Sequence, residues 1–194
     1  FFWFRRDLRL EDNVALHNAL KTSNKVQAIF IFDDEILNKL PKDDARVSFI
    51  YKTLSHIDDI LKSHGASLIV KKGKPLSIWE ALIAENDIEA VFVNKDYEPY
   101  AIKRDLEVQT LLNDKGLSMY SFKDQVIFEE NEVVKNDGLP YTVYTPYKNK
   151  WLQKFESKND TGNYAITFEN FSKNQFTMPS LNSIGFVNSL ILIR

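Results

Sequence analysis

The chain opens with the sequence FFWFRRDLRLEDN (residues 1–13), in which an apolar half is followed at once by a charged half. The uninterrupted aromatic residues 1–4 are typical of a strand that is buried on both faces, as central strands of a parallel sheet are. Three arginines and three acidic residues then lie between Arg5 and Asp12. In an open α/β sheet, this charged segment would lie just beyond the carboxyl end of the strand, where such folds bind ligands. Asn13 provides a good N-cap for a helix over residues 14–21.

Strand-like and helix-like segments alternate five times between residues 1 and 122. This pattern predicts an α/β fold with a five-stranded parallel sheet, helices on both faces and right-handed crossovers, which is a Rossmann-like, doubly wound arrangement. The expected strands are residues 1–4, 26–32, 68–70, 90–93 and 117–122.

The helices have recognisable start and stop signals. Asp44 is expected to cap a long helix that Gly65 ends, and Pro75 is expected at the start of the next helix. The core-facing stripe of the long helix is predicted to be Val47, Ile50, Leu54, Ile57 and Leu61. In a later helix over residues 101–115, we expect Ile102, Leu106 and Leu111 to face inward.

The regular alternation ends after Phe122. Residues 125–134 and 141–147 are expected to be extended and rich in β-structure, separated by a turn at Asn136-Asp137-Gly138. A short helix is predicted over residues 148–154.

Two parts of the chain are expected from this change of pattern. Residues 1–130 would form the α/β domain, and residues 131–194 would form an extended connector. Within the connector, residues 156–183 are predicted to be an irregular linker that wraps over a surface.

Composition excludes several classes of function. The net charge of -2 gives no general attraction to nucleic acid, and the absence of cysteine rules out disulfides and thiolate metal sites. No apolar run approaches the length of a membrane span. The N-terminus does not have the pattern of a signal peptide. The spacing of His17, His56 and His64 is not that of a metal site, so we expect no metal. The absence of cysteine fits a cytoplasmic protein, which is the location we expect.

The residues of the opening stretch resemble the start of the DNA photolyase/cryptochrome family. The resemblance rests on WFRRDLRL (residues 3–10), followed by Asp12-Asn13 and Ala15-Leu16. It covers roughly residues 1–155 and continues through residues 91–105 and 139–151.

This resemblance implies the N-terminal, light-harvesting domain of a flavoprotein. In DNA photolyases, that domain holds an antenna chromophore, while a separate helical domain holds FAD and most of the DNA-binding surface. We therefore expect the FAD site and the DNA-binding surface to lie outside this chain, with the helical domain as its partner. The parent protein would be a carbon–carbon lyase that repairs pyrimidine dimers in light, and the present chain alone would not be catalytic. A cryptochrome photoreceptor remains an alternative parent.

Three loops should converge at the carboxyl edge of the sheet, after the first, second and fourth strands. They combine aromatic surface with hydrogen-bonding groups, which suits a flat, polar heteroaromatic ligand. Arg6 could bind a phosphate or carboxylate with two hydrogen bonds. Loop-fixing ion pairs are the competing explanation for these charges, and an internal ion pair is the expected use of Arg104 and Asp105. The candidate cofactor-binding residues are Arg6, Asp7, Phe32, Asp33, Asp34, Asp96, Tyr97 and Glu98.

The type of antenna chromophore is indicated by two positions. Folate-binding relatives have an Asn-Glu pair where this chain has Tyr100 and Ala101, which cannot supply the same hydrogen bonds. A deazaflavin or FMN is therefore favoured over folate. The alternative from another class is a non-enzymatic module of the same fold that binds AMP, FMN or a protein partner.

Overall fold

Five parallel strands form one sheet in the order β3-β2-β1-β4-β5, as the computed structural model shows for residues 1–157 and 164–191. Every pairing of neighbouring strands is parallel, which confirms the predicted sheet. The chain runs outward from β1 to β3 and then crosses back to β4, so the order reverses between β1 and β4. The strands are β1 (Phe2–Phe4), β2 (Ala28–Asp33), β3 (Leu68–Gly73), β4 (Ala90–Asn94) and β5 (Ser118–Phe122).

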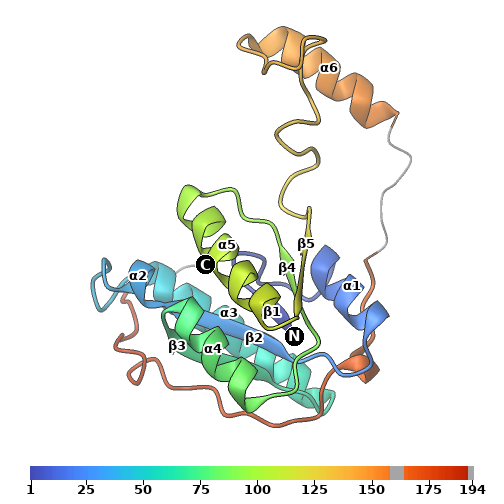
Figure 1. The fold of residues 1–194 in the computed structure, drawn as a ribbon. Helices are drawn as coiled ribbons and strands as arrows, with labels where there is room; N and C mark the ends of the chain where they lie inside the picture. The colour runs from blue at the N-terminus through green and yellow to red at the C-terminus, as the bar shows by residue number, and fades with distance from the viewer. Residues whose placement is uncertain (158–163, 192–194) are drawn as a thin grey trace.

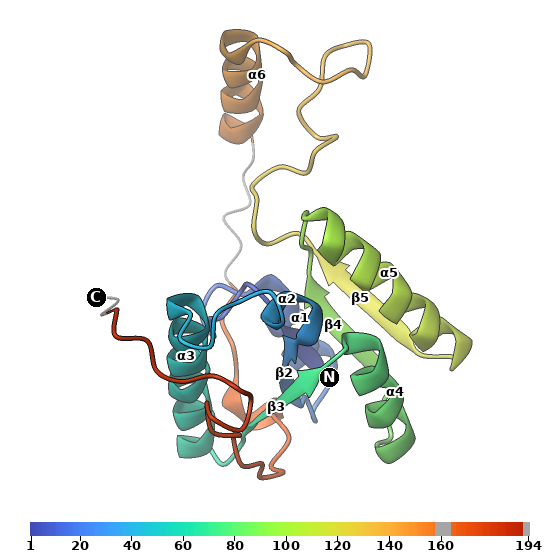
Figure 2. The ribbon, with the colours of Figure 1, turned by 90° about the vertical axis from the view of Figure 1, so that its left-hand side faces the viewer.

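Helices cover both faces of this sheet, as predicted (Figures 1 and 2). Helices α1 (Val14–Thr22) and α3 (Ala45–Ser63) pack on one face. Helices α4 (Pro75–Glu85) and α5 (Pro99–Asp114) pack on the other. The short α2 (Asp34–Leu37) follows β2 directly.

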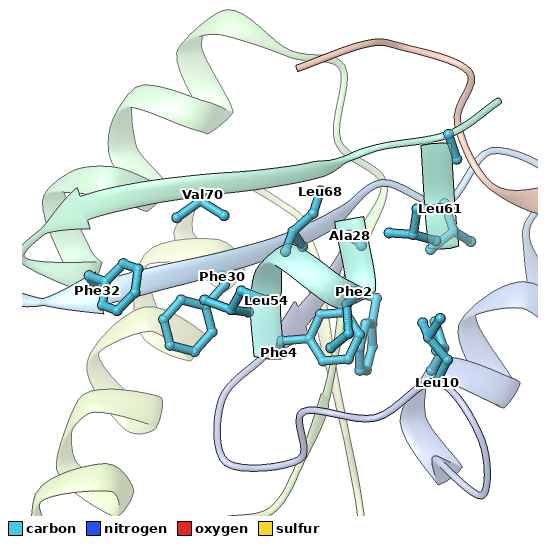
Figure 3. Close-up of a cluster of buried hydrophobic side chains, with 14 of the residues drawn as sticks. Phe2, Phe4, Leu10, Ala28, Phe30, Phe32, Leu54, Leu61, Leu68 and Val70 are labelled. Carbon is cyan, nitrogen blue, oxygen red and sulfur yellow. The ribbon is translucent and has the colours of Figure 1, made fainter. Parts of the chain in front are cut away.

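The opening aromatic run supplies both layers of the core. Successive side chains of a strand point to opposite faces, so Phe2 and Phe4 join the layer under α1 and α3 while Trp3 joins the layer under α4 and α5. Figure 3 shows the first layer, in which Phe2 and Phe4 lie beside Phe30 and Leu54. In the second layer the rings of Trp3 and Trp79 meet edge to face, with centroids 5.4 Å apart.

The predicted helix signals are confirmed. Asn13 Oδ1 accepts a hydrogen bond from Leu16 N at 3.1 Å, and Asp44 Oδ1 accepts one from Arg46 N at 2.9 Å. Gly65 follows α3 with φ +75°, a conformation that glycine adopts readily. Pro75 is the first residue of α4. The stripe on α3 is buried as expected except at Ile50, which is half-buried.

The inward face of α5 was predicted wrongly. Ile102 and Leu106 are 55% and 61% exposed, and Leu111 is only half-buried. Another stripe of the helix faces the sheet, and it includes Arg104, whose guanidinium lies over the ring of Trp3. The buried residues of α5 are Ala101, Arg104, Val108 and Leu112.

The expectation of β-structure after β5 was also wrong. Within the described residues 123–157 no strand forms, and Tyr144–Glu156 forms helix α6. This helix includes the predicted short helix over residues 148–154, and it also occupies residues 144–147 of the segment that was expected to be β-structure. The turn at residues 136–138 is confirmed, since Gly138 N donates to Lys135 O at 3.0 Å. In both views of the ribbon, α6 stands away from the sheet (Figures 1 and 2).

The described part of the C-terminal segment is irregular and runs back over the α/β layers, as predicted. Apart from the 3₁₀ turn η1 (Phe168–Asn170), residues 164–191 have no helix. Phe171 bridges to Val26, and its ring is buried in the same layer as Leu181, Ile184 and Phe186. The part of the predicted linker at residues 158–163 lies outside the described residues. The division into domains at residue 130 stays a prediction.

The helices of the described residues do not reach the length and apolarity that a bilayer span requires.

Candidate functional site

Two adjoining cavities lie at the carboxyl edge of the sheet, near the point where the strand order reverses. Open α/β sheets bind their ligands at such a point. The first, here called the apolar cavity, has a volume of about 240 Å³ and is walled by Trp3, Phe4, Phe30, Ile31 and neighbouring side chains. The second, here called the polar cavity, has a volume of about 490 Å³ and lies between the loop after β1 and the end of β4. The two cavities share Arg5, Arg6 and Asp96.

Five of the eight predicted site residues line the apolar cavity. They come from the ends of three strands, so the predicted convergence of the three loops is observed. Whether they bind a ligand stays a prediction. These residues are Arg6, Phe32, Asp33, Asp96 and Glu98.

Asp33 is the most buried acid of this group, and both of its carboxylate oxygens have partners. Oδ1 accepts from Glu35 N at 2.9 Å and caps α2, while Oδ2 accepts from the hydroxyl of Tyr100 at 2.5 Å. Burial, together with the hydrogen bond to Asp33, raises the pKa of Tyr100 above its ordinary range. The phenol therefore stays protonated and ties the end of β2 to the first turn of α5.

Arg6 is held only loosely at the opening of the cavity. Its Nη1 lies 3.5 Å from Asp96 Oδ1 and 3.4 Å from Glu98 Oε1, and its side chain is half-exposed. Exposed pairs at such distances contribute little to stability. The guanidinium is thus available to a ligand that offers a better acceptor.

Asp7 has a structural role in this arrangement. Its carboxylate accepts from Arg5 N at 2.8 Å, from Asn94 Nδ2 at 2.5 Å and from Asn13 Nδ2 at 3.3 Å. Asn94 Oδ1 in turn accepts from Ala15 N at 2.9 Å. This network fixes the loop after β1 to the end of β4 and the start of α1, and Asp7 lines the polar cavity instead of the apolar one.

The remaining two predicted residues lie away from both cavities. Asp34 is the first residue of α2, and its Oδ1 is 3.8 Å from Lys72 Nζ. Tyr97 lines a separate groove between α5 and β5. Burial and the neighbouring Glu129 carboxylate raise the pKa of Tyr97 to about 12.

Among the lining residues that were not predicted, two pairs have a spacing that could have identified them. Trp3 and Arg5 are two positions apart in an extended segment, and Tyr100 and Arg104 are four apart on α5, so each pair shares one face. These spacings were a usable signal once the strand and the helix had been assigned. The Cζ atoms of Arg5 and Arg104 lie 5.4 and 5.2 Å from the Trp3 ring centre.

The expected internal ion pair between Arg104 and Asp105 is confirmed. Arg104 Nη2 lies 3.0 Å from Asp105 Oδ1, and Arg5 Nη1 pairs with Asp105 Oδ2. One carboxylate therefore serves two guanidinium groups beneath the apolar cavity.

The arrangement is suited to holding a flat polar ring. Aromatic and aliphatic side chains line the apolar cavity together with guanidinium groups, carboxylates and a phenol. In the part of the chain that the structure describes, no three potential metal ligands gather in one place.

Comparison with known proteins places the chain in a family. The family model described as DNA photolyase matches residues 1–172. A deoxyribodipyrimidine photo-lyase from Synechococcus is 32% identical over 150 residues, which are 77% of this chain and 31% of that protein. Proteins named cryptochromes also match. The chain spans about a third of the length of the curated photolyases that it matches.

Two solved structures show the same arrangement of sheet and helices. A class III photolyase from Agrobacterium tumefaciens superposes with a TM-score of 0.76 and 25% identity, over 97% of this chain and 38% of that one. A photolyase from Sulfolobus tokodaii that contains two FAD molecules superposes with a TM-score of 0.61 and 32% identity, over 67% of this chain and 31% of that one. The sequence, the sheet order and these matches together show that the chain belongs to the DNA photolyase family.

Proposed function

We propose that the apolar cavity binds an antenna chromophore and that the chain is the light-harvesting domain of a photolyase-like protein. The observation that carries this proposal is the cavity itself, an aromatic-walled site at the reversal point of the sheet in a member of the photolyase family. The Sulfolobus tokodaii relative supports it, because its second FAD was described as implying a new light-harvesting cofactor.

A flavin or deazaflavin suits this cavity better than a folate. The apolar cavity, at about 240 Å³, is smaller than the roughly 300–1,000 Å³ of typical ligand pockets. It could enclose a ring system while a polar tail extends into the polar cavity. Ala101 offers no side-chain hydrogen bond, and the hydroxyl of Tyr100 is already bound to Asp33. The Asn-Glu pair of folate-binding relatives thus has no equivalent here.

This proposal assigns different roles to the two domains of the parent protein. Bound pigment would supply absorption of near-UV or blue light, and this chain would hold it in a fixed position and keep water from its ring. FAD binding, DNA binding and splitting of the pyrimidine dimer would belong to the helical domain of the parent. We propose a cytoplasmic location for that protein, and no dimer repair by this chain alone.

A blocking substitution tests the site directly. Ile36 lines the apolar cavity and is 46% exposed, so Ile36→Trp should narrow the cavity without overpacking the core. Ile127 is 43% exposed and lies after β5, so Ile127→Trp is a matched control. We expect at least a tenfold weaker binding of FMN, FAD or a deazaflavin by Ile36→Trp, measured by absorption titration, and no change in Ile127→Trp.

The nucleotide-module alternative is distinguished in the same titration. If AMP competes with the pigments for the wild-type cavity and binds as tightly as they do, the antenna proposal is wrong and a nucleotide-binding module is supported. Equal pigment binding by Ile36→Trp and Ile127→Trp would also contradict the antenna proposal.

A further inference from the structure

The ion-pair cluster beneath the apolar cavity carries an excess of positive charge. Arg5 and Arg104 share the single carboxylate of Asp105. The three side chains are 4%, 10% and 19% exposed, respectively. Two guanidinium groups against one carboxylate leave one positive charge within this cluster, at a place where water has little access. Buried charges normally have partners, because their desolvation is costly.

Arg5 is the member of the cluster with an unused hydrogen-bond donor. Its Nη1 pairs with Asp105, whereas its Nη2 is buried and has no acceptor among the residues that the structure describes. The guanidinium also lies over the face of Trp3, an interaction that attracts the charge but accepts no hydrogen bond along the plane of the guanidinium. Leaving such a donor without a partner is unfavourable.

The carboxylates of the apolar cavity are engaged with other groups. Both oxygens of Asp33 accept hydrogen bonds, from Glu35 N and from Tyr100. Asp96 and Glu98 lie next to Arg6 at the opening. The apolar cavity is therefore lined by carboxylates that already have partners and by Arg5, whose buried Nη2 has none among the described residues.

We propose that Arg5 is a ligand-binding residue, whose buried Nη2 donates a hydrogen bond to an oxygen atom of the bound chromophore. This inference rests on the proposed function and defines the ligand more closely. The ligand presents an oxygen-bearing edge, a ring carbonyl or an oxyanion, to Arg5, and the surplus positive charge of the cluster favours an oxygen that carries negative charge. Its N–H or hydroxyl groups face the carboxylates.

The test uses Arg5→Met and a matched control. Methionine keeps much of the side-chain volume, and its introduction leaves Arg104 and Asp105 as a balanced pair. Arg46→Met removes the same charge and also breaks an ion pair, because Arg46 Nη2 lies 2.7 Å from Asp44 Oδ2, but Arg46 lies on α3 and lines neither cavity. Thermal unfolding establishes that each variant is folded, and Arg5→Lys, which keeps a donor, is measured if Arg5→Met does not fold.

The probes are riboflavin and FMN, which share a ring with two carbonyl oxygens and differ by a phosphate. Loss of a hydrogen bond from a charged donor should weaken binding to Arg5→Met by roughly ten- to a hundredfold. If the ring oxygen is the acceptor, both probes are affected and the carbonyl stretching band of the bound flavin moves to higher frequency. If the phosphate is the acceptor, only FMN is affected and the band stays in place. Arg5→Lys should retain part of the affinity.

Either pattern, with Arg46→Met unchanged, supports the inference. If the wild type binds flavin, and Arg5→Met binds both probes like Arg46→Met with the same carbonyl frequency, the role of Arg5 is excluded while the antenna proposal stands. If Arg5→Met does not fold, an affinity and a carbonyl frequency for Arg5→Lys that match Arg46→Met exclude that role equally. If the wild type binds neither flavin nor a deazaflavin, both proposals fail.

Discussion

The α/β body (residues 1–122) and the arm that follows it (residues 123–157) are stabilised in different ways. In the body, β1 and β2 are buried at every position, and α1, α3, α4 and α5 each bury a face against the sheet. In the arm, α6 has no buried residue along its 13 positions. Burial of apolar surface is the dominant stabilising contribution in folded domains, so most of the free energy of folding must come from the body.

The arm depends instead on local contacts around Glu132. The Glu132 carboxylate accepts from Lys123 Nζ at 2.6 Å and from Glu129 N at 2.5 Å, while its backbone oxygen accepts from Lys154 Nζ. Phe128 and Trp151 meet edge to face at 5.4 Å. The comparison shows why the proposed binding site lies in the body. A pigment needs fixed surroundings, and the side chains of the body are locked by packing, whereas α6 has no buried residue.

Removing core volume should have the largest effect and should separate the two regions. Leu54 is fully buried on α3, and Leu152 is 41% exposed on α6. Leu54→Ala should lower the free energy of unfolding by about 2–5 kcal/mol, whereas Leu152→Ala should change it by less than about 0.5 kcal/mol. Urea unfolding followed by circular dichroism measures both. If both variants lost a similar amount of unfolding free energy, the proposed contrast between body and arm would be wrong.

The polar network at the start of α1 should give the next largest effect. Asn13 is fully buried, caps α1 and also contacts Asp7 and Asn94. Asn13→Ala should lower the free energy of unfolding by about 2 kcal/mol, because the helix cap and the buried hydrogen bonds are lost.

Asn18 is a control within the same helix. Its side chain donates only to Val14 O, and alanine is the better helix former, so Asn18→Ala should have almost no effect on the free energy of unfolding. If Asn18→Ala lowers the free energy of unfolding as much as Asn13→Ala does, the polar network at the start of α1 has no special role in stability.

The smallest expected effect concerns the pH dependence of the arm. The hydrogen bond from Lys123, followed by that from Glu129 N, lowers the pKa of Glu132 below its usual range. A folded-state pKa below the unfolded one means that the stabilising contribution is present above the ordinary glutamate pKa and is lost as the pH falls through the lowered value.

A carboxyl NMR titration measures this pKa directly. Lys123→Met should return the pKa of Glu132 towards its ordinary value, and the global unfolding transition should change little, because the arm adds little to the stability of the body. A large shift of that transition would show that the arm and the body unfold as one unit.

The body could be predicted well from the sequence because its signals are local and agree with one another. The aromatic run at residues 1–4, the cap at Asn13 and the glycine at position 65 each specify one backbone conformation. On α5 the apolar residues Ile102 and Leu106 gave a plausible stripe, but the buried stripe is Ala101, Arg104, Val108 and Leu112. Its charged member, Arg104, has Trp3 and Asp105 as partners. Such partners belong to the tertiary structure and cannot be read from periodicity.

The arm was predicted less well for a similar reason. Tyr, Thr and Val at positions 141–147 favour strands as isolated residues, but no neighbouring strand is present in the described structure to pair with them, and the segment from Tyr144 forms a helix. At the candidate site, the loops were identified correctly, whereas Asp7 and Asp33 proved to be engaged in hydrogen bonds within the protein. Hydrogen-bond partners from distant parts of the chain decide which of several acids remains free.

The most direct test of the central claim is an absorption spectrum of the purified chain, taken alone and after equilibration with FMN, FAD, a deazaflavin and a reduced folate. We predict one equivalent of bound flavin or deazaflavin, seen as a near-UV or blue band that is retained on gel filtration and lost in Ile36→Trp. The fluorescence of Trp3, which lines the cavity, should be quenched at the same time. A protein that stays colourless with all four pigments would contradict the proposed antenna site, and one that retains only the folate would contradict the choice of a flavin or deazaflavin.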